Sequence, residues 1–224
     1  MITRTTILQI LLVTTAAVLG AASWMVFLFA PEERVMGFVQ KIFYFHVPSA
    51  WMMLLSVPIM AVGAIGYLAT RKPAWDRVTD SAVELSILFG VLALITGPLW
   101  GRKAWGVFWV WDARLTSSLV LVMTLVACKI VRSYAGSSAR QVAAALSVLA
   151  VLNAAFVWVS VDIWRGTHPP KLVQTLEDEM RITFRLCAVG FLLAYASLFW
   201  MRLRMGKLKD RVDELELRML EDPA

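Results

Sequence analysis

Four of the ten tryptophans of this chain lie in one short stretch, residues 99–116, which reads LWGRKAWGVFWVWDARLT. The stretch holds Trp100, Trp105, Trp109 and Trp111, and the charged residues Arg102, Asp112 and Arg114 lie among them. Tryptophans in an aromatic belt at a membrane surface are spread among helix ends, whereas these are concentrated in one place. The spacing predicts a broad aromatic surface for a flat, largely apolar ligand.

The chain has only two histidines, and each lies beside prolines. His46 is in KIFYFHVPSAW, where Pro48 suits the first turn of a helix and leaves His46 at or just before its cap. His168 is in VDIWRGTHPPKL, where the two prolines after it restrict the backbone. Either histidine alone fits a hydrogen-bonded interface residue, but two imidazoles can also bind opposite faces of one haem iron.

The charged residues of the tryptophan-rich stretch suit the same ligand. Arg102, Lys103 and Arg114 could pair with the propionate carboxylates of a haem. Asp112 has two readings, because it could cap the helix that follows or pair with Arg114 or a ligand. Together with the two histidines, these residues suit a flat, apolar, iron-bearing macrocycle such as haem.

The elements that must position these residues are membrane spans. The chain has 224 residues, of which 59% are hydrophobic and 17% charged, and its mean hydropathy is +0.70. A soluble domain would carry about 25% charged residues, and one helical span needs about 20 mainly apolar residues. We expect an all-α polytopic membrane protein with six spans, near residues 7–30, 45–69, 82–99, 115–131, 142–161 and 182–201.

Counting these spans places the candidate residues together. The first, third and fifth connections must lie on one side of the membrane, whichever way the protein is inserted. His46, the tryptophan-rich loop and His168 belong to these three connections. We therefore expect them to meet at one membrane surface.

The last residues form a second, smaller unit in this prediction. Residues 1–206 make the transmembrane domain, with the tryptophan-rich loop at 99–116, and residues 207–224 make an amphipathic tail with an apolar stripe at Leu208, Val212, Leu215 and Met219. Such a helix could lie against the membrane or its own protein, or bind a partner. Lys and Arg in the tail favour cytoplasmic N- and C-termini under the positive-inside rule.

Several other functions lack support in the sequence. The net charge of +6 comes mostly from residues that flank apolar runs, so nucleic acid is not an expected partner. Cys128 and Cys187 lie in apolar runs outside any CxxC pair and are expected to be small buried hydrophobes. Glu84, the clearest acid within a span, suits a charge at a helix start better than a metal permease. No nucleophile–base pair or nucleotide-binding loop indicates an enzyme.

At WGRKAWGVFWVWDARLTS the chain resembles the tryptophan-rich WWD signature of haem-handling proteins in cytochrome c biogenesis. Six spans, FHVPSAW in the first outer loop and a histidine in the third outer loop narrow the resemblance to CcmC, the haem exporter protein C family. One departure is that Ile163 precedes Trp164, where relatives often show two adjacent tryptophans.

The resemblance implies a bacterial inner-membrane protein that binds haem b at the periplasmic surface and passes it to the haem chaperone CcmE. It implies work alongside the transporter components CcmA and CcmB and the small protein CcmD. In this reading His46 and His168 are the axial ligands, and the four tryptophans with Asp112 form the platform. The alternative function is a bis-histidine membrane cytochrome of b type, an electron carrier, although such proteins usually hold their histidines in the middle of a bundle.

Overall fold

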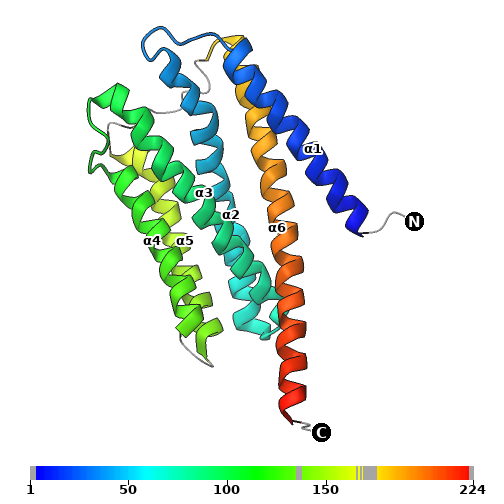
Figure 1. Cartoon of the computed structure of the whole chain (residues 1–224). Coiled ribbons are helices and arrows are strands. Elements are labelled where there is room, and N and C mark those ends of the chain that lie inside the picture. Colours follow the sequence, from blue (N-terminus) through cyan, green and yellow to red (C-terminus); the bar gives the residue numbers. More distant parts are fainter. Residues whose placement is uncertain (1–3, 135–137, 165, 167, 169–175, 222–224) are drawn as a thin grey trace.

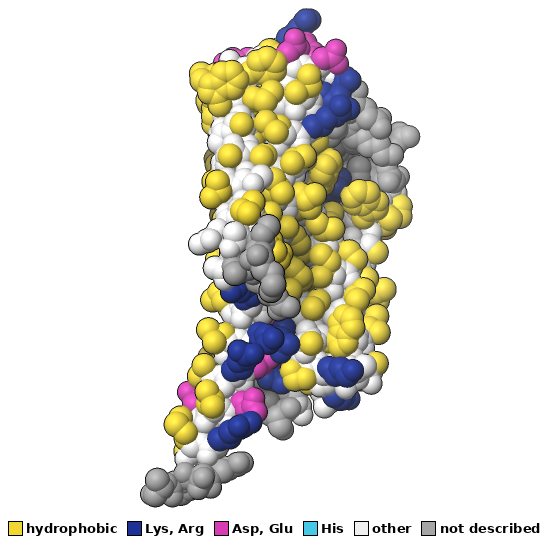
Figure 2. All heavy atoms as spheres, turned by 90° about the vertical axis from the view of Figure 1, so that its right-hand side faces the viewer, with side chains coloured by type: hydrophobic (Ala, Val, Ile, Leu, Met, Phe, Trp, Pro, Cys, Tyr) yellow, Lys and Arg dark blue, Asp and Glu magenta, His cyan; other side chains and the backbone are white. Residues whose placement is uncertain are grey.

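A computed structural model describes residues 4–134, 138–164, 166, 168 and 176–221 of the chain. Six long helices run side by side (Figure 1). They are α1 (Arg4–Trp24), α2 (Phe43–Thr70), α3 (Pro73–Trp105), α4 (Ala113–Tyr134), α5 (Ala139–Ile163) and α6 (Asp178–Glu221). Each is long and apolar enough to cross a membrane, which confirms the predicted all-α fold with six spans. Figure 2 shows apolar side chains covering much of one face, with Lys and Arg gathered toward the tail end.

Two short helical turns connect α1 to α2. A π-helix, Met25–Phe29, continues directly from α1, and a 3-10 helix, Phe38–Ile42, leads into α2. The buried ammonium of Lys41 donates to the carbonyl oxygens of Val26, at 2.6 Å, and Ala30, at 3.2 Å. Carbonyl groups at a helix end have no partner within the helix, so Lys41 satisfies them and fixes the end of the first span beside α2.

The turn between α2 and α3 is much shorter than the sequence indicated. Arg71 adopts the left-handed conformation with φ of 58° and ends α2, while Pro73 begins α3. Proline suits the first position of a helix because its missing N–H would have no partner there. The predicted start of the third span near residue 82 is therefore wrong, since only Arg71 and Lys72 lie between α2 and α3.

The main core lies where α2, α3, α4, α5 and α6 meet. Met60, Ala82, Leu121 and Leu125 are fully buried in this cluster. A Cβ added to Gly90 of α3 would lie 2.6 Å from Val122 Cγ2 and 3.0 Å from Met53 Sδ. Gly90 therefore lets α3 approach both neighbours closely, and this packing holds the ends of the helices that carry the site.

A charged cluster joins α3, α4, α5 and α6 at the end of the bundle near the tail. Lys129 Nζ lies 2.5 Å from Asp80 Oδ1 and 2.7 Å from Glu84 Oε1. Glu84 also pairs with Arg202 of α6. The expectation that Glu84 is a charge at a helix start is wrong, because α3 begins at Pro73 and Glu84 connects three helices.

The tail continues α6 without a break. This helix runs from Asp178 to Glu221 and extends beyond the other helices (Figure 1). Asp210 pairs with Arg77 of α3 and lies 3.8 Å from Arg140 of α5. Leu208, Val212, Leu215 and Met219 are all exposed, so the apolar stripe does not pack on the described part of the protein.

Candidate functional site

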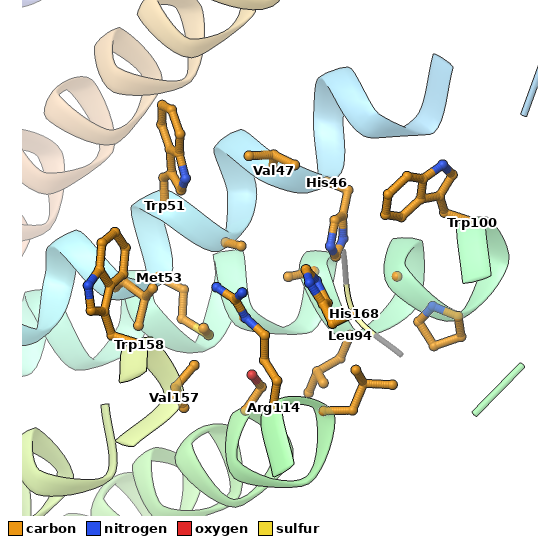
Figure 3. A pocket seen from close by; sticks show the side chains of 18 of the residues that line it. His46, Val47, Trp51, Met53, Leu94, Trp100, Arg114, Val157, Trp158 and His168 are labelled. Carbon is orange, nitrogen blue, oxygen red and sulfur yellow. The ribbon is translucent and has the colours of Figure 1, made fainter. Parts of the chain in front are cut away.

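A pocket lies between α2, α3, α4 and α5 at the end of the bundle opposite the tail (Figure 3). Its cavity volume is about 120 Å³. Figure 3 shows the imidazoles of His46 and His168 extending into the same space, with Arg114 beside them. The predicted site residues that line this pocket are His46, Trp100, Trp105, Trp109, Arg114 and His168. The structure thus brings the residues of three separate connections to one place.

His46 lies in the first turn of α2, because the helix begins at Phe43, earlier than the sequence indicated. Its Nδ1 lies 3.0 Å from Thr96 Oγ1 on α3. The Thr96 hydroxyl donates its proton to the Leu92 carbonyl oxygen at 2.7 Å, so its oxygen accepts from His46 Nδ1–H. This arrangement leaves the Nε2 lone pair of His46 for a metal, because the hydrogen bond at one ring nitrogen decides the role of the other.

Gly97 gives His46 room against α3. A Cβ at this position would lie 3.0 Å from His46 Cε1, closer than ordinary van der Waals contact. The imidazole therefore rests directly on the backbone of α3, next to the threonine that orients it.

Trp100 is a wall of the pocket and belongs to the packed interior. Its side chain is buried, and its Nε1 donates to Gln40 Oε1 at 3.2 Å. The ring centroids of His46 and Trp100 are 6.1 Å apart, and Phe43 packs against the same indole at 6.2 Å. Trp100 therefore lies beside His46 and is fixed by Gln40 of the 3-10 helix that precedes α2.

The other three tryptophans have distinct positions and do not form one flat shelf. Trp105 ends α3 and folds over Gly101, where a Cβ would lie 2.6 Å from the indole. Trp109 lines the pocket and meets Trp111 edge-on, with centroids 5.6 Å apart and planes at 74°. Trp111 is 75% exposed and is not among the residues that line the pocket. Within the stretch 99–116, only residues 106–112 lie outside the helices, so Trp100 and Trp105 belong to α3.

Trp109 carries a buried polar atom with no protein partner. Its Nε1 is buried, and no hydrogen-bond acceptor lies within reach among the residues that the structure describes. A buried donor without a partner costs about 1–3 kcal/mol. Because this indole lines the histidine pocket, the N–H is available to a bound ligand with an acceptor oxygen.

The predicted charged residues divide between the pocket and its surroundings. Arg114 lines the pocket. The guanidinium of Arg102 lies 5.2 Å from the centroid of the Phe108 ring and donates to the Gly106 carbonyl oxygen. Asp112 Oδ1 accepts from the Leu115 backbone N–H at 2.8 Å, which makes Asp112 the N-cap of α4. Of these three, the structure places only Arg114 in the pocket lining.

His168 lies in the connection after α5 and is partly buried at the pocket. The same connection meets the tryptophan-rich turn at Gly166, where a Cβ would lie 3.0 Å from Asp112 Oδ2. Pro169 and Pro170, which were expected to restrict the backbone at His168, lie outside the described residues.

Sequence reasoning missed five residues that build this site. Thr96 and Gly97 position His46, and Gln40 holds Trp100. Trp51 and Trp158 line the pocket and are 40% and 61% exposed. Their exposure places them at the apolar outer surface, so the pocket reaches the lipid-facing side between α2 and α5. A helical period could place Thr96 four residues before Trp100, but it could not show which side chain the threonine meets.

The donor set favours a metal that arrives inside a macrocycle. Within the described part of the chain, no group of three or more His, Cys, Asp or Glu side chains could hold a bare metal ion. Two imidazoles leave most positions of an iron unfilled, and a porphyrin ring supplies the missing nitrogen ligands. Apolar and aromatic walls, Arg114 and the Trp109 N–H fit the ring and its carboxylates.

Six apolar helices and an aromatic pocket with two histidines define a polytopic membrane protein with a binding site at one end of its bundle. Residues 1–218 match the family described as "Heme exporter protein C", and the chain belongs to this family. This finding confirms the resemblance that the WWD signature indicated.

Individual relatives agree with this assignment. The "Heme exporter protein C" of Bradyrhizobium diazoefficiens is 34% identical over 195 residues, covering 84% of this chain and 74% of the relative. The protein of the same name from Escherichia coli K12 is 34% identical over 201 residues, covering 85% and 81%. A "Putative cytochrome c biosynthesis ccmC-like mitochondrial protein" of Marchantia polymorpha is 31% identical over 172 residues, covering 77% and 72%.

Proposed function

We propose that this protein binds haem b at the periplasmic surface of the bacterial inner membrane and delivers it to the haem chaperone CcmE during cytochrome c maturation. The names of its relatives support a role in haem export and cytochrome c biosynthesis. We propose a transport role and no enzymatic activity for this chain. The observation that carries the proposal is the pair of histidines on one aromatic pocket, with His46 Nδ1 held by Thr96.

In the proposed complex, His46 and His168 would hold the iron of bound haem through their imidazoles. The N–H of Trp109 and the guanidinium of Arg114 would hold the propionates, and Trp105 would pack on the ring. Trp100 would keep His46 in place through Gln40. Trp111, Arg102 and Asp112, which lie outside the pocket lining, would act at its rim.

The shape of the pocket favours a delivery protein over an electron carrier. The exposed Trp51 and Trp158 are among the residues that line the pocket, so it is open at the surface of the bundle. We infer that a bound porphyrin would reach the outer surface of the bundle on the side of these two tryptophans. His46 lies in the first turn of its helix. Bis-histidine b-type cytochromes, the alternative function, usually hold their histidines in the middle of a bundle.

Topology and partners complete the proposal. Lys and Arg in the tail support cytoplasmic N- and C-termini. With that orientation, the proposed histidine pocket would face the periplasm. The expected partners are CcmE, the transporter components CcmA and CcmB, and CcmD. Cysteines introduced at Phe108 and Arg211, labelled from outside intact cells with a membrane-impermeant maleimide, test the topology. Labelling at position 108 alone is expected.

Optical spectroscopy of the purified protein tests the function. We expect the wild type to show a six-coordinate low-spin haem spectrum, before and after dithionite. His46→Ala and His168→Ala should each reduce retained haem and disturb that spectrum, and imidazole should restore the low-spin form. Transfer to purified CcmE then separates delivery from electron transport, because a resident cytochrome would keep its haem. Normal spectra in both histidine variants would exclude the axial-ligand assignment.

A further inference from the structure

A second cavity, an apolar groove of about 680 Å³, lies on the outer surface of the bundle between α6, α2 and the start of α3. The histidine pocket and this groove share no lining residue. The apolar residues that line the groove include Leu55, Ile59, Leu192, Phe199, Trp200 and Leu203. An exposed apolar groove on membrane-spanning helices meets lipid acyl chains, so its natural contents are lipid.

The groove runs from the middle of the bundle toward the tail end. On α6 its lining extends from Leu192 to Lys207, 15 positions apart in the sequence. At about 1.5 Å per residue this separation is about 22 Å. One leaflet contributes about 15 Å of hydrocarbon, so the groove can hold an acyl chain and still reach the headgroup level.

Basic side chains line the tail end of the groove. They are Arg77, Arg204 and Lys207, and none of the described residues that line it is acidic. Arg77 is paired with Asp210, whereas Arg204 and Lys207 are exposed. Long basic side chains lay their stems along apolar surface and carry the charge to the membrane surface. Trp200, in the turn before Arg204, has the amphipathic indole that is enriched at that level.

We propose that this groove is a binding site for an anionic glycerophospholipid. The acyl chain lies along Leu55, Leu192 and Phe199, and the phosphate-bearing headgroup is held by Arg204 and Lys207. A zwitterionic lipid has the same chains but no net charge, so the two basic residues give the preference for an anionic lipid. This site belongs to the tail-side leaflet, the side on which Lys and Arg gather in Figure 2.

Native mass spectrometry of the full, delipidated chain in detergent tests the site. Phosphatidylglycerol and phosphatidylcholine with identical acyl chains are the probes. Each Lys or Arg near a charged membrane surface contributes about 1 kcal/mol, so two should favour phosphatidylglycerol by roughly tenfold or more. The double variant Arg204→Gln with Lys207→Gln should bind both lipids almost equally.

Two further variants separate the groove from general surface charge. Arg211→Gln with Arg218→Gln removes the same charge from the same helix, outside the groove, and should keep the tenfold preference. Ala196→Trp should fill the groove and weaken the binding of both lipids. The variant should still elute as one species in size-exclusion chromatography. Equal binding of the two lipids by the wild type, or an equal loss in the Arg211 and Arg218 variant, would overturn the proposal. Unchanged lipid binding by Ala196→Trp would also overturn the proposal. So would a wild-type protein that binds neither lipid, and the groove would then suit a membrane-spanning helix of another protein.

Discussion

The imidazole Nδ1 of His46 lies 3.0 Å from the hydroxyl oxygen of Thr96, and this contact joins α2 to α3 at the histidine pocket. The hydroxyl proton of Thr96 is directed to the Leu92 carbonyl oxygen, 2.7 Å away. The threonine therefore acts as an acceptor for His46, and the ring is held with Nε2 free to bind iron. Thr96 is a positioning residue of the proposed site, because it acts through the histidine.

Thr96→Val should weaken haem binding by roughly tenfold or more, since loss of a partner to a metal-ligating histidine typically costs 10–100-fold. Valine keeps the shape of threonine but cannot accept from Nδ1–H. Haem titration followed by absorbance measures the affinity, and the low-spin fraction reports the histidine directly. Thr96→Ser is the matched control and should resemble the wild type. Wild-type affinity and spectrum in Thr96→Val would show that the hydrogen bond does not position His46.

Gly97→Val should also lower haem affinity, because even the first carbon of the new side chain would lie 3.0 Å from His46 Cε1. The imidazole must then move from its place on α3. Gly20→Val is the control in another span, since a Cβ there has no neighbour within 4 Å. Haem titration and thermal unfolding should show a loss of affinity at Gly97 and little change at Gly20. Equal losses would indicate a general effect of valine in these helices.

The tryptophans should differ in a defined order. An aromatic stack on a flat ring is worth about 1–3 kcal/mol in nucleic-acid sites, so Trp105→Ala or Trp109→Ala should weaken haem binding by roughly one to two decades. Trp111→Ala should have a smaller effect, because Trp111 is 75% exposed and absent from the pocket lining. Trp24→Ala is the control, since Trp24 is 58% exposed in the first span. Similar losses at Trp24, Trp105 and Trp109 would favour general destabilisation.

Hydropathy alone was sufficient to predict six helices, because each span carries about 20 apolar residues. It could not find the true start of α3, where Asp76, Asp80 and Glu84 interrupt the apolar pattern. Those acids are compensated by Lys129, Arg132 and Arg202, which come from helices distant in the sequence. A hydropathy scale scores each charged residue by itself. It therefore predicted too short a helix for α3, whose acidic residues are paired with basic residues of other helices.

The candidate site, like the helices, could be predicted only in part from the sequence. Counting spans predicted that His46 and His168 share one end of the bundle, and both line one pocket. The orientation of His46 depends on Thr96, and the indole planes of Trp109 and Trp111 depend on how the turn between α3 and α4 folds. These details arise from tertiary contacts, which the spacing of residue types does not encode.

Asp76→Asn should lower the stability of the bundle without changing haem affinity. The Asp76 side chain is 5% exposed, and its Oδ1 accepts from Arg132 Nη1 at 2.6 Å. Removing one partner of a buried ion pair typically costs about 3–5 kcal/mol, and the loss should be smaller here because Asp80 Oδ1 still lies 3.2 Å from Arg132 Nε. Thermal unfolding of the purified protein measures the loss. Glu214→Gln is the control, since its pair with Arg218 is on the exposed tail and should contribute less than about 1 kcal/mol. An equal midpoint of thermal unfolding for the two variants would contradict the stabilising role of the Asp76–Arg132 pair.

Removing the tail should leave haem binding intact, because the tail and the histidine pocket lie at opposite ends of the bundle (Figure 1). The structure distinguishes two truncations. Deletion of 212–224 keeps Asp210 and its pairs with Arg77 and Arg140, so it should change neither the haem spectrum nor the thermal midpoint. Deletion of 208–224 removes Asp210 and should lower the midpoint while the spectrum is retained.

The comparison of these truncations separates stability from binding. Asp210→Asn in the full-length chain should reproduce the lower midpoint of the 208–224 deletion, since it removes the same charge that holds α6 to α3 and α5. If haem were lost from a stably inserted 212–224 deletion, the tail would contribute to the pocket. That outcome would contradict the placement of the histidine site at the far end of the bundle.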